Sequence, residues 1–168
     1  MANTYVLIST VTVGSGGAST IDFTSIPATY TDLKLVCSLR NSGANNWAGL
    51  IFNGSAASFT MKNIKAYATT ATSQSVTDYI YVAQQNMSTD TSNTFSSVEV
   101  YIPNYTSNKY KSVSMDTVGE NNATESYAEL TAGLWSNTAA ITQIDLVERT
   151  NSGWQVGTIA TLYGITAA

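Results

Sequence analysis

The sequence predicts an all-β fold, a single antiparallel β-sandwich, jelly-roll-like, with about ten strands over residues 1–168. Apolar residues recur at every second position in most of the chain. This is the period of a strand with one buried face and one wetter face. Clusters of Gly, Asn, Ser and Thr separate these runs at intervals of roughly 8–15 residues. The sequence shows no interdomain linker and no convincing repeat, so one domain is expected.

Alternation and turn signals place the strands of the first half of the chain. Leu33, Leu35 and Cys37 alternate with Lys34 and Ser38, which indicates a half-buried strand. The Gly-rich stretch 14–17 and the polar stretch 69–77 are predicted as a break and a loop. Residues 53–54, Asn-Gly, predict a type I′ hairpin turn, because both residue types tolerate positive φ. The strands expected here lie at 5–13, 33–39, 47–52 and 64–68.

The second half continues the same pattern. Ala128, Leu130 and Ala132 alternate with Glu129 and Thr131, and this period favours a strand with one buried and one wetter face. Residues 125–134 also fit a short helix, because Ala and Leu are good helix formers. Polar loops are predicted at 88–93, 104–108, 120–125 and 151–153. The strands expected here lie at 79–85, 97–102, 112–116, 128–135, 143–147 and 159–165.

The chain contains no histidine and one cysteine, and only 11% of its residues are charged. Histidine is the usual proton-transfer group near neutral pH, and common Zn, Cu and non-haem Fe sites need His or clustered Cys. Cys37 has no intrachain partner and is expected in the core. These absences argue against an enzyme and predict neither a cofactor nor a transition metal.

Charge and hydropathy limit the expected partners. The net charge is −4 and the Lys and Arg residues are scattered, so a nucleic-acid partner is disfavoured. No stretch approaches the roughly 18 apolar residues of a membrane helix, and no secretory signal is recognisable, so we expect no membrane association. Synthesis in a cytosol is expected.

Acidic residues offer one weak candidate metal site. Asp116, Glu120 and Glu125 lie in a stretch rich in oxygen ligands, which calcium accepts. The spacing matches no EF-hand or RTX repeat, so an ordinary acidic hairpin loop is the favoured interpretation. Carboxylate pairs can also hydrolyse glycosides, but the default for such residues is solvated surface. No catalytic residue is assigned.

Five aromatic residues are candidates for contact with a partner. Aromatic rings stack on the apolar faces of sugars, and Tyr and Trp are also enriched in cores and subunit interfaces. Packing in the core or at an interface is the favoured reading, and glycan contact is the alternative. The five candidates are Trp47, Tyr105, Tyr110, Trp135 and Trp154.

Several stretches resemble a family of tailed-bacteriophage virion proteins frequent in marine and cyanobacterial phages. The stretches are FSSVEVYIPNYTSNKYKSVS at 95–114, ENNATESY at 120–127, TAGLWSNTAAIT at 131–142 and ATLYGI at 160–165, with GASTIDFTSIPATYTDL at 17–33 and FNG at 52–54. The resemblance touches most of the chain, and 62–93 is the least familiar part.

This resemblance implies a non-enzymatic structural protein of the virion and brings no catalytic residues with it. A compact, self-contained domain suits a capsid decoration or cement protein that binds the outer shell and stabilises it. Its expected partners are the major capsid protein and copies of itself, as a homotrimer by analogy. The alternative is a tail-fibre or receptor-binding module that recognises host-surface glycan. The expected location is the virion, at the capsid surface rather than the tail.

Overall fold

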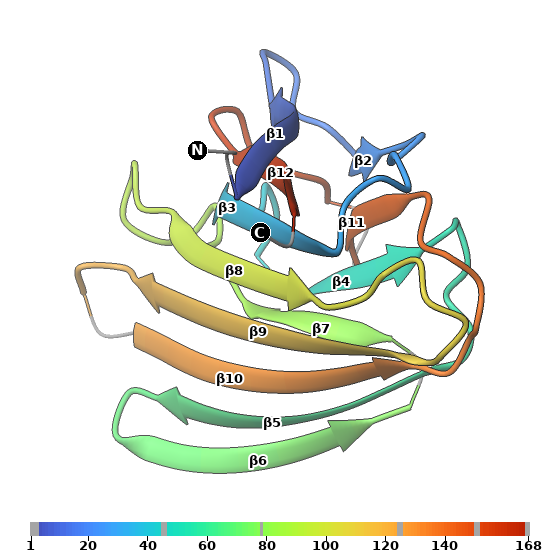
Figure 1. The fold of residues 1–168 in the computed structure, drawn as a ribbon. Helices are drawn as coiled ribbons and strands as arrows, with labels where there is room; N and C mark the ends of the chain where they lie inside the picture. Colours follow the sequence, from blue (N-terminus) through green and yellow to red (C-terminus); the bar gives the residue numbers. More distant parts are fainter. Residues whose placement is uncertain (1–3, 45–46, 78, 124–125, 150–151, 167–168) are drawn as a thin grey trace.

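The computed structural model describes residues 4–44, 47–77, 79–123, 126–149 and 152–166, which form two facing antiparallel sheets (Figure 1). The predicted all-β sandwich is confirmed, with twelve strands in the described part of the chain. The eight-stranded sheet runs in the order β1 (Tyr5–Thr12), β12 (Ile159–Ile165), β3 (Asp32–Leu39), β8 (Ser96–Ile102), β9 (Lys111–Glu120), β10 (Ser126–Trp135), β5 (Phe59–Tyr67) and β6 (Thr70–Val76). The four-stranded sheet runs in the order β2 (Thr20–Phe23), β11 (Ile144–Glu148), β4 (Trp47–Phe52) and β7 (Ile80–Gln84).

Eight of these strands have the topology of a jelly roll. When β5, β6, β9 and β10 are set aside, the sheets β1-β12-β3-β8 and β2-β11-β4-β7 remain. Along these eight strands the chain alternates between the two sheets, except that β4 and β7 are paired in the small sheet, as in a pair of Greek keys. The predicted jelly-roll-like arrangement is therefore present, and four further strands are added to it.

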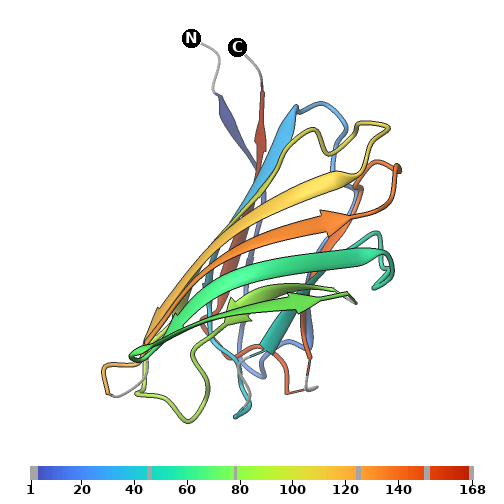
Figure 2. The same ribbon diagram turned by 90° about the horizontal axis from the view of Figure 1, so that it is seen from below.

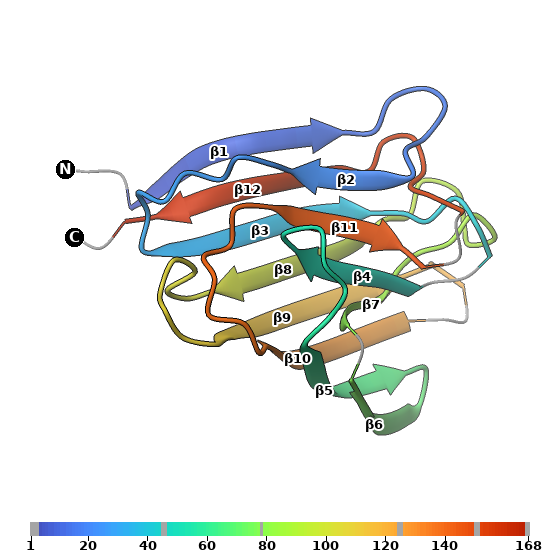
Figure 3. The same ribbon diagram turned by 90° about the vertical axis from the view of Figure 1, so that its right-hand side faces the viewer.

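The added strands are two hairpins that widen the larger sheet. One hairpin, β5–β6, lies between β4 and β7 in the sequence, and the other, β9–β10, lies between β8 and β11. They join through a continuous β10–β5 register from Tyr127 opposite Tyr67 to Trp135 opposite Phe59. We call β9, β10, β5 and β6 the extension, and Figures 2 and 3 show them side by side as one curved layer.

The hydrophobic core lies between the two sheets. Leu35 and Val100 from the large sheet and Leu50 and Leu146 from the small sheet have no exposed surface. Cys37 is buried beside them, as expected, and its burial raises the pKa of its thiol. Burial of these alternating apolar faces, at about 25 cal/mol per Å², is the main force that holds the sheets together.

The predicted turn at 53–54 is confirmed, but the strands around it do not form the predicted hairpin. Asn53 and Gly54 both have positive φ, and the amide of Ser55 donates to the carbonyl of Phe52 at 3.1 Å. Strands β4 and β5 then enter different sheets. The turn type depends on local backbone preference, whereas strand pairing depends on the whole topology.

Residues 69–77 were predicted as a loop, and this is wrong. Most of the stretch is β6, which pairs with β5 along its whole length, from Val76 opposite Met61 to Thr70 opposite Tyr67. Its Thr, Ser and Gln side chains are compatible with an edge strand that has little to bury. The short strand β2 was also missing from the sequence prediction.

Strand β10 is confirmed, and the helical alternative at 125–134 is wrong, but the strand faces the opposite way from its apolar pattern. Glu129, Thr131 and Trp135 point into the sandwich and are buried, whereas Leu130 is 58% exposed. Alternation requires that neighbouring residues point to opposite faces, and it leaves open which face is covered. Here the inner face of the extension is partly polar and its outer face is partly apolar.

Candidate functional site

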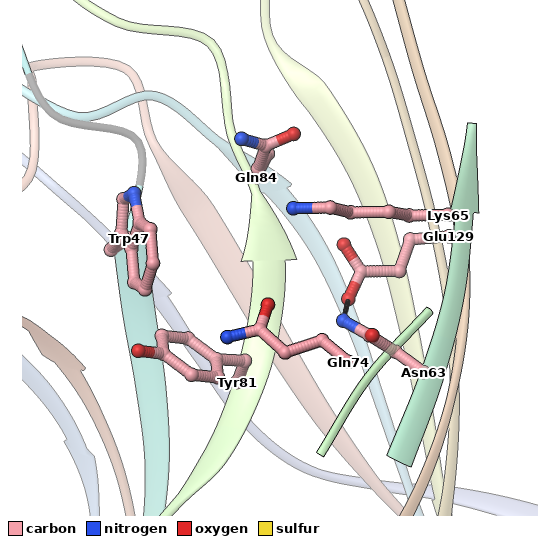
Figure 4. A pocket seen from close by; sticks show the side chains of 7 residues that line it. All are labelled: Trp47, Asn63, Lys65, Gln74, Tyr81, Gln84 and Glu129. Atoms are coloured by element: carbon pink, nitrogen blue, oxygen red, sulfur yellow. Dashed lines mark hydrogen bonds between the residues drawn. The ribbon is translucent and has the colours of Figure 1, made fainter. Parts of the chain in front are cut away.

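A pocket lies between the end of the small sheet and the inner face of the extension (Figure 4). Strand β7 crosses this inner face and contacts β9, β10 and β5. One wall of the pocket comes from β4 and β7, and the other comes from β5, β6 and β10. Seven residues line it: Trp47, Asn63, Lys65, Gln74, Tyr81, Gln84 and Glu129.

Two aromatic rings form the first wall. Trp47 is 39% exposed, and its ring meets that of Tyr81 edge to face at 4.8 Å between centroids. Tyr81 is buried, is hydrogen-bonded through its hydroxyl to that of Tyr79, and donates its backbone amide to the Met61 sulfur at 3.0 Å. Arg149 in turn lies over the Tyr79 ring at 3.4 Å. Trp47 therefore lies on a packed support while part of its ring remains open to solvent.

A buried carboxyl group and a buried carboxamide form the opposite wall. Glu129 and Asn63 are each 5% exposed, and Asn63 Nδ2 donates a hydrogen bond to Glu129 Oε1. Thr131 Oγ1 donates to the same oxygen at 3.2 Å. Asn63 Oδ1 is buried and has no hydrogen-bond partner in the described structure. A buried polar atom without a partner carries a free-energy cost that a bound donor would remove.

The mouth of the pocket carries flexible polar side chains. Lys65 lies directly opposite Glu129 in the sheet register, and Gln74 lies opposite Asn63. Figure 4 shows the Lys65 amine reaching toward Gln84 and the carboxamide of Gln74 beside Tyr81. The pocket thus combines a cation, a carboxyl group and several carboxamides, which together donate and accept hydrogen bonds.

The pocket is small. Its open space, including the mouth, is about 240 Å³, and the inner part is only wide enough for a group about the size of a water molecule. A molecule larger than this cannot enter the inner part of the pocket as a whole, and only a small group could reach it.

A second surface lies on the other side of the extension. Its cross-strand neighbours are apolar and exposed, including Leu130 opposite Ile64, which is 66% exposed, and Ala128 opposite Val118. Shallow hollows run along the same strands. We call this surface the outer patch, and it consists of Ile64, Ala66, Ala71, Val118, Ala128, Leu130 and Ala132.

The structure divides the five aromatic candidates between the core and the surface. Trp47 lines the pocket, and Tyr110 is 59% exposed elsewhere. Tyr105, Trp135 and Trp154 are buried and present no surface to a glycan or a subunit, so they are removed as contact residues. The buried polar atoms of two of them have partners: the Tyr105 hydroxyl donates to the Pro27 carbonyl, and Trp154 Nε1 donates to the Leu146 carbonyl at 3.1 Å.

The weak calcium candidates do not come together in the described residues. Asp116 and Glu120 both point outward from β9, and they are four positions apart, which separates them by about 13 Å along a strand. Glu125 lies outside the described residues. Across the described ranges no group of three or more potential ligands is close enough to hold a metal ion.

The sequence interpretation missed most of the pocket and all of the outer patch. Asn63 and Glu129 interrupt the buried phase of their strands with polar groups, and this interruption was the available signal. The alternation around Leu130 predicts one buried and one wetter face, and the structure places Leu130 on the exposed one.

No family model, curated protein or solved structure matches this chain. In the described part of the chain, no helix is long and apolar enough to cross a membrane.

Proposed function

We propose that this chain is a non-enzymatic structural protein of a tailed-phage virion, and that it acts as a capsid decoration protein. The outer patch is the observation that supports this role best. Leu130 and Ile64 are large apolar side chains held on a rigid sheet, and small residues surround them. Such a surface can be buried against another protein with little loss of side-chain entropy.

The partner is the major capsid protein. Charged residues border the outer patch, with Lys62 and Asp116 beside it, and they give the contact a polar rim. Burial of the patch across neighbouring capsid subunits would stabilise the shell, because the bound form is favoured by mass action. Jelly rolls occur in viral capsid and lectin domains, which is an analogy at the level of the fold only. A homotrimer at a local three-fold position is the assembly proposed.

Particle composition tests this proposal. Quantitative mass spectrometry of purified virions should count hundreds of copies, and cryo-electron microscopy should place the chain on the capsid surface. A handful of copies, or density on the tail alone, would contradict the capsid role.

Substitutions then test the outer patch itself. Leu130→Glu and Ile64→Glu should leave folding intact, because both side chains are exposed, and should lower the occupancy of the chain on particles. Val156→Glu is the matched control, since Val156 is 51% exposed and lies outside the patch. Equal occupancy for all three variants would exclude the outer patch as the docking face.

A tail-fibre or receptor-binding module is the second candidate function. It is favoured by the partly exposed Trp47 beside a polar pocket. Copy number separates the two candidates, because tail modules are present in few copies per particle.

A further inference from the structure

We propose that the pocket between β4, β7 and the extension binds a neutral saccharide, with the sugar ring on Trp47 and one hydroxyl group inserted toward Asn63 and Glu129. This proposal is independent of whether the chain sits on the capsid or on the tail, because it concerns the inner face of the extension and not the outer patch.

The polar wall carries the first step of the argument. Asn63 Oδ1 accepts no hydrogen bond from the described residues, and Glu129 Oε1 accepts from Asn63 and Thr131. A saccharide hydroxyl is both a donor and an acceptor, so it can donate to these buried oxygens and accept from the amine or carboxamides at the mouth. A partner that only donates or only accepts would leave part of the lining unsatisfied.

The charges at the pocket favour a neutral ligand. Lys65 and Glu129 are opposite one another in the β5–β10 register and both line the pocket. A cationic side chain that approached Glu129 would meet the Lys65 amine, and an anion that approached Lys65 would meet the Glu129 carboxyl group. A hydroxylated ligand without charge avoids both repulsions.

The aromatic wall and the size of the pocket determine how the ligand lies. A sugar ring cannot enter an inner space about the size of a water molecule. The ring must therefore pack outside, and the exposed part of Trp47 gives it an apolar surface beside the opening. The edge-to-face contact with Tyr81 holds the indole in place, so little side-chain conformational freedom is lost on binding.

The experiment uses the full chain and an array of neutral oligosaccharides with gluco-, galacto- and manno-configured hydroxyl groups. The tightest binder is then titrated into the protein, and acrylamide quenching of tryptophan fluorescence is measured at each saccharide concentration. Trp135 and Trp154 are buried, whereas Trp47 is 39% exposed, so quenching reports on Trp47. The saccharide should protect Trp47 from the quencher in a saturable manner.

Substitutions distinguish saccharide binding at this pocket from nonspecific binding elsewhere on the protein. Trp47→Ala should weaken saccharide binding on the array about tenfold or more, and Trp47→Phe should retain part of it, because loss of one aromatic contact is worth about a factor of ten. Gln74→Ala and Glu129→Gln should each weaken it several-fold, with Gln74→Ala the safer variant for folding because its side chain is at the mouth. Tyr110→Ala, an exposed aromatic outside the pocket, should bind as the wild type does.

Three results would overturn the proposal. The first is that no oligosaccharide on the array binds the wild-type chain at millimolar concentration. The second is that Trp47→Ala binds as tightly as the wild type while its thermal unfolding is unchanged. The third is that a Lys- and Arg-rich peptide, rather than a saccharide, protects Trp47, which would assign the pocket to a cationic partner.

Discussion

Leu130 of β10 lies directly opposite Ile64 of β5, and both side chains point to solvent, while their neighbours Glu129 and Asn63 point into the sandwich. The outer face of the extension is therefore partly apolar, where a surface strand is usually polar, and its inner face is partly polar, where it is usually apolar. The outer patch lies on the outer face of these strands, and the pocket lies on their inner face. This arrangement gives the chain two candidate contact surfaces on the same strands.

This arrangement predicts that two leucines differ sharply in their contribution to stability. Leu35→Ala should lower the free energy of unfolding by about 2–5 kcal/mol, because Leu35 has no exposed surface and its loss leaves a cavity. Leu130→Ala should change it by less than about 0.5 kcal/mol, because Leu130 is on the surface. Urea denaturation of both variants measures the difference. Similar losses would mean that Leu130 is covered in the folded chain.

Gly133 of β10 is predicted to be intolerant of a side chain. A Cβ atom there would lie 2.7 Å from Ile80 Cδ1 of β7, closer than such atoms approach. Gly133→Ala should therefore destabilise the fold by about 1–3 kcal/mol, as overpacked cores do. The double variant Gly133→Ala with Ile80→Val should recover part of the loss, because the δ-methyl group is removed. Strictly additive effects in chemical denaturation would contradict this contact.

Asp145 is predicted to make stability fall as pH rises. Burial raises its pKa from the ordinary value of 3.8, and Asp22, its cross-strand neighbour on β2, raises it further. The folded chain then holds the proton to higher pH than the unfolded chain does. The contribution of Asp145 to the free energy of unfolding is therefore fully present below pH 3.8, and it is lost as pH rises through the raised pKa.

Asp145→Asn removes this titration. The variant should melt at a higher temperature than the wild type at pH 7, and the difference should shrink toward pH 3, as followed by circular dichroism. Asp116→Asn, at an exposed position of β9, serves as the control and should change the melting temperature little at either pH. A wild-type advantage at pH 7 would show that Asp145 is stabilised as a carboxylate.

Arg40 is predicted to hold the loop between β7 and β8 in place. Its guanidinium is buried and donates to the carbonyls of Asp90, Thr91 and Thr94 at 3.0, 2.9 and 2.7 Å, and to Gln155 Oε1 at 2.6 Å. Lysine cannot reproduce this planar set of donors. Arg40→Lys should therefore cost about 1–3 kcal/mol and speed amide hydrogen exchange around Thr91. Unchanged exchange in this loop would indicate that other contacts hold it.

The sequence was a good guide to several features that depend on neighbouring residues, although it missed β2 and predicted β6 as a loop. Alternation along Leu33, Leu35 and Cys37 predicted a half-buried strand. The Asn53–Gly54 pair predicted the turn that follows β4. Backbone preference and the two-residue period are local properties, so they can be recognised without knowledge of the fold. The absence of histidine is equally plain from the sequence alone.

The side of a strand that becomes buried is a different kind of property, because it depends on what covers it. Only the tertiary structure brought β7 across the inner face of the extension and left Leu130 outside. It also buried Trp135 and Trp154 while it left Trp47 partly exposed, across the pocket from Glu129. The sequence by itself determined an all-β chain and most of its strands. The pairing of two distant hairpins decided which side chains are exposed, since exposure is set by contacts between strands far apart in the chain.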